Sequence, residues 1–441
     1  MDKEFCLLDE PWIKVLDEQN VTREVSLIDI FTNAHRYKRL AGETVTQDAA
    51  ILRLLLAVAI TVFYRYRADG CEDWVLEYDD PEEEILNRWS EYWDSGAFNA
   101  NVFQEYLETY RERFYLFHPE TPFWQVADLE DGTNYSVINL FGNIKESNNA
   151  ASRHHFHTID GSYIDNISYA EAARWIVYNN AYSVNVKTKV DGENKPTGVG
   201  RLGQLGLIIV EENTLYKIMM MNLCALNING EVWNNPKPIW EKEPRTRPGV
   251  EIVAPDNLPQ LYTIQSRRLL LYRDNEKILG YRSIGGDYYS TVDDLTEPMT
   301  LLRRDGKEKI SFKPKKHAKE IVAWREFPSL LVENELKPGI ICWLENLMHN
   351  SVIDNKQIVT FRMIGLEYGD GMSYTNGELI DESLSMSNEF LNQVGRVWIT
   401  YITDQVNKCE DVVQKALYKF AKNLSLYLYK AVSYTHLTLP T

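Results

Sequence analysis

Cysteine is scarce in this sequence, and the few that occur are widely spread. The five cysteines form no Cys-x-x-Cys pair, which argues against both a zinc ribbon and a disulfide framework. Such sparse usage suits a reducing cytoplasm. The five residues are Cys6, Cys71, Cys224, Cys342 and Cys409.

Positive charge is also in short supply, because 47 lysines and arginines face 64 aspartates and glutamates, a formal net charge of -17. A protein coated in nucleic acid needs lysine and arginine for its phosphate contacts, so the total charge argues against that class. The charge is uneven, however. Residues 303–319 hold eight basic and two acidic residues, whereas residues 72–84 hold eight acidic residues and no basic one. Local patches of this kind decide where a polyanion binds.

Long hydrophobic runs and a secretory leader are missing as well. The first residues, Met1 to Glu4, have neither a basic nor an apolar signal region. The most apolar run, residues 49–64, is interrupted by Arg53 and is short for a bilayer, so we predict a core helix. With 44% hydrophobic and 12% aromatic residues, the 441-residue chain predicts two or three globular domains.

The sequence lacks the short motifs of familiar active sites. There is no G-x-S-x-G, no H-E-x-x-H and no cysteine beside an obvious partner histidine, although a dispersed active site stays open. Three of the eight histidines, His154, His155 and His157, lie close together without the carboxylate or cysteine spacing of a metal site. We therefore predict no metal and no cofactor.

A glycine-rich stretch at residues 195–206 is the most distinctive local feature. It places four glycines in nine residues around Arg201, and glycine is used where a backbone needs positive φ or a close approach. The stretch is not a P-loop, and it precedes a strand, whereas a dinucleotide fingerprint follows one. Two readings stay open: a plain tight connection, and a loop whose bare amides touch the backbone of a ligand.

Hydrophobic periodicity and capping residues predict the surrounding elements. We expect strands at 207–210, 265–272 and 358–366, a hairpin at 275–289 and a glycine-punctuated tip at 368–374. We expect three helices that begin with the capping residues Ser26, Asp48 and Ser168. Further helices are expected at 213–223, from 378 onward, at 394–406 and at 410–429. The aromatic and proline-rich segment 114–125 favours a plug of the core over a base-stacking platform.

An ordered set of short motifs resembles one family. The motifs are Leu8-Asp9-Glu10-Pro11-Trp12-Ile13, Arg53-Leu54-Leu55-Leu56, residues 117–125, Ala170-Glu171-Ala172-Ala173-Arg174, Gly198 to Gly206, Ser266-Arg267-Arg268 and residues 415–421. Each is weak alone, but their order over about 430 residues resembles the CasA large subunit of the type I-E CRISPR Cascade complex.

This resemblance implies a mixed α+β fold. A large N-terminal α/β domain, residues 1–376, would be followed by the start of a C-terminal four-helix bundle, residues 377–431. Residues 432–441 break the helical pattern, and their codons can resemble a transposon adapter used in sequencing libraries. We expect a truncated gene model with an artefactual tail.

The resemblance also implies a function in the prokaryotic cytoplasm. CasA recognises the protospacer-adjacent motif of duplex DNA, helps to split the duplex so that CRISPR RNA can pair, and docks the helicase-nuclease. It breaks no bond itself. Guide pairing reads most of the sequence, while protein reads a short duplex signal. The implied partners are the other Cascade subunits, CRISPR RNA, target DNA and the helicase-nuclease, with no membrane.

The family's motif-reading residues carry over onto two segments. The glycine loop falls on Gly198, Val199 and Gly200, whose bare backbone would approach the minor groove. That groove mainly separates A·T from G·C pairs, which makes readout permissive. A lysine finger falls on the hairpin after residue 275, with Lys277 as the candidate and Arg282 as the second choice.

Two further elements carry over. The strand wedge falls on Gly371, Met372 and Ser373, where Met372 replaces the family's usual glutamine; an apolar side chain can still insert between base steps. A loop that contacts the Cascade core and the DNA entrance falls on residues 149–157, and its candidate residues are Asn149, Phe156 and His157. The basic run 303–319 has no motif match, and we weigh DNA-backbone contact there equally with an ordinary solvated surface.

Two competing functions are retained. One is a purely structural Cascade component that has lost motif readout, an alternative that Met372 keeps open. The other is a divergent nuclease, for which residues 72–84 are the only dense acidic stretch. We interpret that stretch as a solvated loop.

Overall fold

The computed structural model describes most of the chain. The described residues are 3–142, 167–190, 193–244, 251–252, 255–274, 277–289, 296–305, 311–318, 323–326, 330–331, 337–354, 356–373, 375–391 and 396–427. The expected loop residues Asn149, Phe156 and His157, the tip residue Tyr374 and the tail 432–441 lie outside these ranges.

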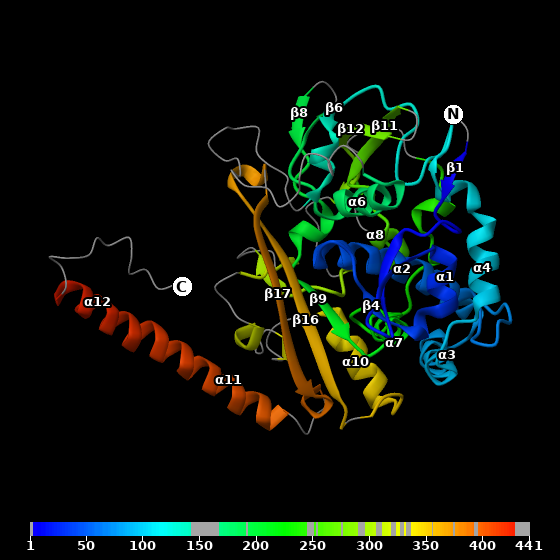
Figure 1. Cartoon of the computed structure of the whole chain (residues 1–441). Coiled ribbons are helices and arrows are strands. Elements are labelled where there is room, and N and C mark those ends of the chain that lie inside the picture. Colours follow the sequence, from blue (N-terminus) through cyan, green and yellow to red (C-terminus); the bar gives the residue numbers. More distant parts are fainter. Residues whose placement is uncertain are drawn as a thin grey trace.

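Helix α2 (Val45–Arg65) forms the centre of the body (Figure 1). Nineteen of its 21 residues are buried, because leucine, isoleucine, valine and alanine cover its whole circumference. The helix is long and apolar enough to cross a membrane, but 89% of its most apolar window is buried inside the protein. It contacts α6 (Tyr169–Tyr182) and α8 (Leu258–Tyr262), which confirms the expected core helix.

The predicted capping residues are largely correct. Ser26 accepts a hydrogen bond from the Asp29 amide at the start of α1 (Leu27–Asn33), and Ser168 accepts one from Glu171 at the start of α6. The cap predicted for α2 is wrong, because Thr44 caps it and Asp48 lies in its first turn, where its Oδ1 accepts from Gly42 instead.

The N-terminal 142 residues combine small sheets with helices. Their elements are β1 (Glu4–Cys6), β2 (Ile13–Asp17), β3 (Thr22–Val25), η1 (Ala34–Arg36), β4 (Tyr37–Leu40), η2 (Val75–Glu77), α3 (Pro81–Ser95), α4 (Ala100–Thr109), η3 (Arg111–Phe114), β5 (Tyr115–Phe117), β6 (Thr133–Ser136) and η4 (Val137–Leu140). The acidic stretch 72–84 ends in the first turn of α3, where Asp80 caps the helix and carboxylates interact favourably with the helix dipole.

The middle of the chain holds further short elements. They are β7 (Lys187–Val190), β8 (Glu193–Pro196), η7 (Arg201–Gln204), β9 (Leu207–Glu211), α7 (Leu215–Met221), η8 (Ile239–Glu241), β10 (Glu251–Ile252), β11 (Arg267–Asp274), β12 (Lys277–Gly285) and β13 (Tyr288–Tyr289). The strand predicted at 207–210 is confirmed as β9. The hairpin predicted within 275–289 is instead made by β11 and β12, in which Asp274 pairs with Lys277.

The last part contains one long hairpin and one long helix. Its elements are β14 (Leu302–Asp305), β15 (Ser311–Pro314), η9 (Ala323–Glu326), α10 (Gly339–His349), β16 (Ile358–Tyr368), η10 (Asp370–Met372), β17 (Thr375–Ser387), η11 (Asn388–Leu391), α11 (Arg396–Asp411), the π-helical turn η13 (Val412–Leu417) and α12 (Tyr418–Tyr427). Strands β17, β16 and β9 form one antiparallel sheet.

The helix predicted from residue 378 is wrong. Strand β17 crosses the expected boundary between residues 376 and 377 and pairs with β16 along its length. Its alternating pattern places Ile380 and Met386 in the core, a period of two that favours a strand. The helical part therefore begins at Arg396.

The fold is mixed α+β, as expected in its broad class. Within the described ranges every strand pair is antiparallel except β10 with β13, so the sheets are α+β and not the parallel sheet of an α/β domain. The two C-terminal helices expected at 394–406 and 410–429 form one nearly continuous helix, α11 through α12, which projects from the body (Figure 1). The four-helix bundle stays a prediction.

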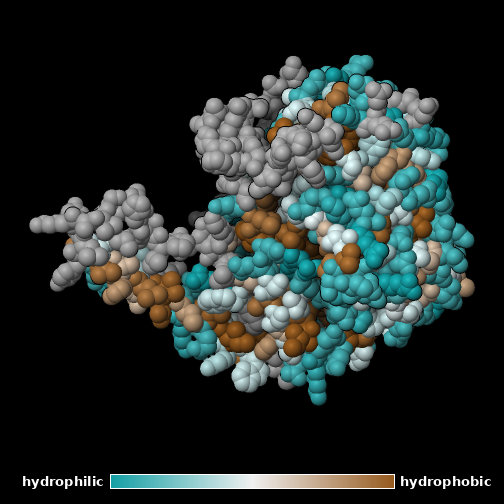
Figure 2. All heavy atoms as spheres, in the orientation of Figure 1, coloured by the Kyte–Doolittle hydropathy of each residue, from teal (hydrophilic) through white to brown (hydrophobic). Residues whose placement is uncertain are grey.

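This projecting helix exposes large apolar side chains (Figure 2). An ion pair between Arg325 and Glu410 connects it to the body. The exposed apolar residues are Val397, Trp398, Tyr401, Val412, Val413, Leu417, Tyr418, Phe420, Leu424 and Leu426.

Candidate nucleic-acid interface

A four-residue strip after α6, residues 183–186, holds the glycine loop in place. The Gly200 amide donates to the Ser183 carbonyl at 2.9 Å, and the Thr197 amide donates to the Val186 carbonyl at 3.1 Å. Between them, the Gly198 amide donates to the side-chain Oδ1 of Asn185 at 3.0 Å. The loop therefore forms a ladder of hydrogen bonds with the chain that precedes β7.

The two ends of the loop use glycine for different reasons. Gly198 has φ of 72°, in the left-handed region that favours glycine. At Gly200 an added Cβ would lie 2.5 Å from the Ala181 carbonyl carbon and 2.7 Å from the Tyr182 nitrogen, so the backbones touch. The reading as a tight connection is confirmed, whereas contact with a ligand stays a prediction for the half-exposed residues Thr197 and Gly198.

The expectation of bare amides at this loop needs correction. Val199 and Gly200 are buried, and the amides of Gly198 and Gly200 already donate within the protein. Their burial follows from the close packing of Gly200 on the end of α6. Of the three predicted residues, Gly198 is the one whose backbone is accessible.

The predicted wedge forms a tight turn at the end of the β16–β17 hairpin. Gly371 and Met372 both have left-handed backbones, with φ of 63° and 55°, and the Met372 amide donates to the Gly369 carbonyl at 2.8 Å. A left-handed backbone is uncommon for a residue with a side chain. Met372 is 46% exposed, and Gly371 and Ser373 are exposed too, so the side chains project outward.

The structure brings the wedge and the glycine loop together. The Asn185 amide donates to the Met372 carbonyl at 2.8 Å, and its Nδ2 lies 3.4 Å from the Gly371 carbonyl. The Tyr368 hydroxyl, just before the tip, donates to the Tyr182 carbonyl at 2.8 Å. In Figure 1 the tip accordingly lies on the same side of the body as β8.

A buried arginine supports the loop from below. Arg267 is 2% exposed and donates to the carbonyls of Val184 at 2.8 Å, Gly198 at 2.7 Å and Ser266 at 2.6 Å. Burial lowers the pKa of Arg267 to about 10, which still leaves the guanidinium charged at neutral pH. A positive charge therefore lies directly beneath the half-exposed part of the loop.

The arginine within the glycine stretch is structural. Arg201 is buried, and its Nε lies 3.9 Å from a carboxylate oxygen of Glu297. Arg53 on α2 donates to the two oxygens of Glu297 at 2.6 and 2.9 Å. Burial opposes ionisation of Glu297, but the Arg53 guanidinium overcomes it and lowers the pKa of Glu297. This cluster anchors the C-terminal end of the loop to the core helix.

The predicted finger residue Lys277 lies at the opposite end of β12 from the residue that pairs with Arg267. Lys277 is exposed at the first position of β12, whereas Arg267 pairs with Gly285 at the last. At about 3.3 Å per residue, the nine-residue strand separates Lys277 from Gly285 by roughly 26 Å. The role of Lys277 stays a prediction.

Arg282 is occupied by contacts within the protein. Its guanidinium donates to the carbonyls of Leu129 at 2.8 Å and Glu130 at 2.9 Å and to Oδ1 of Asn134 at 2.9 Å, and it lies over the ring of Tyr272. These contacts fasten the segment before β6 to the hairpin. They favour a structural role for this side chain.

The basic run, residues 303–319, places one lysine beside the hairpin tip. Lys316 is exposed, and its Nζ lies 5.2 Å from the centre of the Tyr368 ring. Its neighbour Lys315 instead pairs with Glu326 at 2.6 Å. Lys316 is therefore the described member of this run that is best placed to meet a phosphate near the tip.

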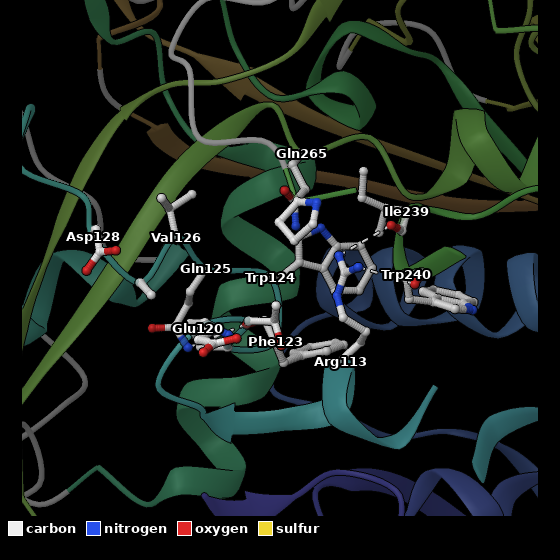
Figure 3. Close-up of a pocket in the computed structure, with 14 residues that line it drawn as sticks. Arg113, Glu120, Phe123, Trp124, Gln125, Val126, Asp128, Ile239, Trp240 and Gln265 are labelled. Atoms are coloured by element: carbon white, nitrogen blue, oxygen red, sulfur yellow. Dashed lines mark hydrogen bonds between the residues drawn. The ribbon is translucent and has the colours of Figure 1, made fainter. Parts of the chain in front are cut away.

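The aromatic segment plugs the core, as predicted. Phe117, Phe123 and Trp124 are buried, and Phe123 packs against Trp12 with ring centres 6.0 Å apart. Trp124 and Gln265 line a small pocket in which Arg113 donates to nearby backbone carbonyls (Figure 3). Rings so enclosed cannot stack on bases.

Sequence reasoning missed Asn185 and the role of Arg267 as a loop support, and it included Lys316 only as one member of the basic run 303–319. The contact from Asn185 to the tip joins positions far apart in the chain, and no local pattern signals it. Arg267 did leave a signal, because a pair of arginines opening an otherwise apolar strand needs acceptors inside the core.

Comparison with known proteins gives consistent likenesses. Residues 7–432 match the family of the CRISPR-associated protein Cse1. The CRISPR-associated protein CasA/Cse1 of Thermus thermophilus is 28% identical over 338 residues, which are 75% of this chain and 60% of that protein. The matched part of the chain thus spans less than two thirds of that relative.

Solved structures resemble the whole body. Cse1 of Thermobifida fusca has a TM-score of 0.78 at 27% identity, covering 93% of this chain and 79% of that one. Cse1 of Acidimicrobium ferrooxidans has 0.74 at 24% identity, covering 94% and 77%. A chain of a CRISPR RNA-guided surveillance complex has 0.72 at 17% identity, covering 96% and 84%; the last two likenesses establish the fold alone.

Proposed function

Because the chain belongs to the Cse1 family, the large subunit of type I-E CRISPR Cascade, we propose that it recognises the short motif that flanks a target in duplex DNA and promotes separation of the strands. It does so as a non-catalytic part of an RNA-guided complex. Guide pairing then reads the remaining target sequence.

One observation carries this proposal: the glycine loop and the hairpin tip lie side by side, joined through Asn185. A half-exposed backbone at Gly198 suits the narrow minor groove, which admits little more than a backbone or a slender side chain. An exposed Met372 next to it suits insertion between base pairs, since apolar wedges part base steps. Reading and opening would thus occur at neighbouring base pairs.

The charges around this site support contact with DNA in spite of the negative total charge. Arg267 holds a positive charge beneath the loop, and Lys316 presents one at the surface beside the tip. Each lysine that meets a phosphate releases a counterion and steepens the salt dependence of binding. We propose Lys316 as such a contact and keep Lys277 as a candidate farther along the duplex.

We propose that the other Cascade subunits, CRISPR RNA and the helicase-nuclease are partners of the chain. The apolar side chains on α11 through α12 support a place in a larger assembly, since exposed apolar patches of this kind mark interaction surfaces. In this proposal that face packs against the remaining helices of the expected bundle.

The test compares complexes assembled with and without this chain on a matched guide. Duplex targets that differ only in the flanking motif are titrated at two salt concentrations. We expect affinity to depend on both the chain and the motif, with a salt slope that grows when the chain is present. If the chain assembles but affinity ignores the motif, the purely structural role is correct.

A further inference from the structure

Asn185 contacts both halves of the candidate interface at once. Its Oδ1 accepts from the Gly198 amide, its own amide donates to the Met372 carbonyl, and its Nδ2 faces the Gly371 carbonyl. A carboxamide carries an acceptor and a donor on one rigid plane. Asparagine therefore suits a position between an amide on one side and a carbonyl on the other.

The contacts of Asn185 fall on left-handed backbone positions, of which Met372 is the strained one. Gly198, Gly371 and Met372 all have left-handed backbones. For Met372 this conformation is unfavourable and persists only where neighbours hold it. The hydrogen bond from Asn185 to the Met372 carbonyl is one such support. A shift of the loop would therefore be transmitted to the strained turn that carries the wedge.

Other hydrogen bonds near the two elements lie below the surface. Tyr368 binds the carbonyl of Tyr182 below the tip, and Arg267 binds the carbonyls of Val184 and Gly198 from the core side. Asn185 forms hydrogen bonds to both the glycine loop and the turn of the tip. It is also half-exposed, so it lies at the level of the surface.

We propose that Asn185 is a positioning residue that couples motif recognition to strand opening. When the motif binds at Gly198, it fixes the orientation of the Asn185 carboxamide. The carboxamide in turn stabilises the left-handed turn that points Met372 into the duplex. This inference rests on the proposed function and adds the route by which the two steps communicate. Coupling of this kind is a free energy shared between two sites.

The expected size follows from the contacts involved. Asn185→Ala removes the side-chain hydrogen bonds but keeps the backbone bond to Met372. Loss of one or two neutral hydrogen bonds corresponds to a change of about three- to tenfold. We expect the acceleration of opening by a matched motif to fall by that factor, while affinity for a target whose strands are already separated next to the motif changes less than about threefold.

The experiment measures opening in the assembled, guide-loaded complex at saturating complex concentration. A fluorescent base analogue in the first base pair beyond the motif reports the first-order opening rate. The opening rate is measured on targets with a matched or a changed motif, for complexes that carry either Met372 or Met372→Ala. The same four measurements are made once in the Asn185 protein and once in the Asn185→Ala protein. A double-mutant cycle of this design isolates the interaction term. Asn99→Ala is the matched control, because Asn99 likewise bonds a loop carbonyl, that of Asp69 at 3.0 Å.

With Asn185 present, we expect the effects of the motif and of Met372 to be non-additive. In the Asn185→Ala background they should become additive, and Asn99→Ala should leave the non-additivity intact. Asn185→Asp keeps the acceptor for Gly198 and loses the donor, so it should retain an intermediate coupling. If Asn185→Ala does not assemble, this second variant decides the question.

Unchanged non-additivity in the Asn185 variants would overturn the coupling while leaving the proposed function in place. Absence of any motif effect on binding and opening in the wild-type complex would instead overturn the proposed function itself. The two failures are therefore distinguishable in one data set.

Discussion

Replacing Gly200 by alanine should disturb the interface through packing alone. The added Cβ would lie 2.5 Å from the Ala181 carbonyl carbon and 2.7 Å from the Tyr182 nitrogen. These are backbone atoms at the end of α6, and they cannot turn aside as a flexible side chain would. The glycine loop must therefore move away from α6, which strains its hydrogen bond to Ser183.

Overpacking of this kind typically costs about 1 to 3 kcal/mol. Since 1.4 kcal/mol is tenfold, displacement of the loop should weaken motif-dependent binding by about fivefold to a hundredfold. The same substitution should lower the free energy of unfolding by a similar amount. A domain is typically stable by about 5 to 15 kcal/mol, so Gly200→Ala should still fold and assemble.

Gly198→Ala is the matched comparison two residues away. Its only near neighbour is Gln204 Nε2 at 3.9 Å, so a Cβ there meets no backbone, and the cost is the left-handed conformation, about 1 to 2 kcal/mol. Gly198→Asn should recover part of that cost because asparagine tolerates this conformation. Binding of matched and changed motifs is titrated, and stability is measured by urea unfolding. Full stability and full motif dependence in Gly200→Ala would refute the packing argument.

Other substitutions test the remaining parts of the account. Met372→Ala should slow strand opening more than it weakens first contact with duplex, and equal losses in the two rates would argue against a wedge. Lys316→Ala should reduce the slope of log affinity against log salt by about 0.9 if it meets one phosphate, and an unchanged slope would exclude that contact. Burial raises the pKa of Asp48 to about 7, above an unfolded value of about 3.9, so the contribution of Asp48 to stability should fall as pH rises from about 4 to about 7. Asp48→Asn keeps an acceptor for the Gly42 amide and should remove that decline. Measured by urea unfolding, its free energy of unfolding above pH 7 should exceed that of the wild type by up to about 4 kcal/mol. An identical dependence of stability on pH in the two proteins would contradict this expectation.

Local signals in the sequence predicted local structure well. Ser26 and Ser168 were identified as caps because a hydroxyl before an apolar run satisfies a free amide at a helix start. The start of α2 was missed because Thr44 and Asp48 both carry suitable oxygens, and only the packed fold shows that Asp48 turns back to Gly42. Strand β17 was mistaken for helix because its identity depends on pairing with β16.

At the candidate site, too, local features were predicted from the sequence and contacts between distant segments were not. The resemblance predicted which segments form the loop and the wedge, and the structure places them together. It did not predict that the amides of Gly198 and Gly200 would be used internally, since hydrogen bonds between distant segments leave no periodic signal. The hairpin that carries Lys277 was placed too far along the chain, because its first arm is β11, and the choice of Lys277 itself stays a prediction.

The most direct test of the central claim asks whether the tip meets DNA beside the motif. A photoreactive phenylalanine analogue is placed at Met372 in the assembled complex, and the crosslinked nucleotide is mapped. The same analogue at Ile358, which is 66% exposed at the opposite end of β16, is the control. We expect crosslinks from position 372 to the first base pairs beyond the motif, dependent on the motif, and none there from position 358. Crosslinks from position 372 that are absent, or that ignore the motif, would contradict it.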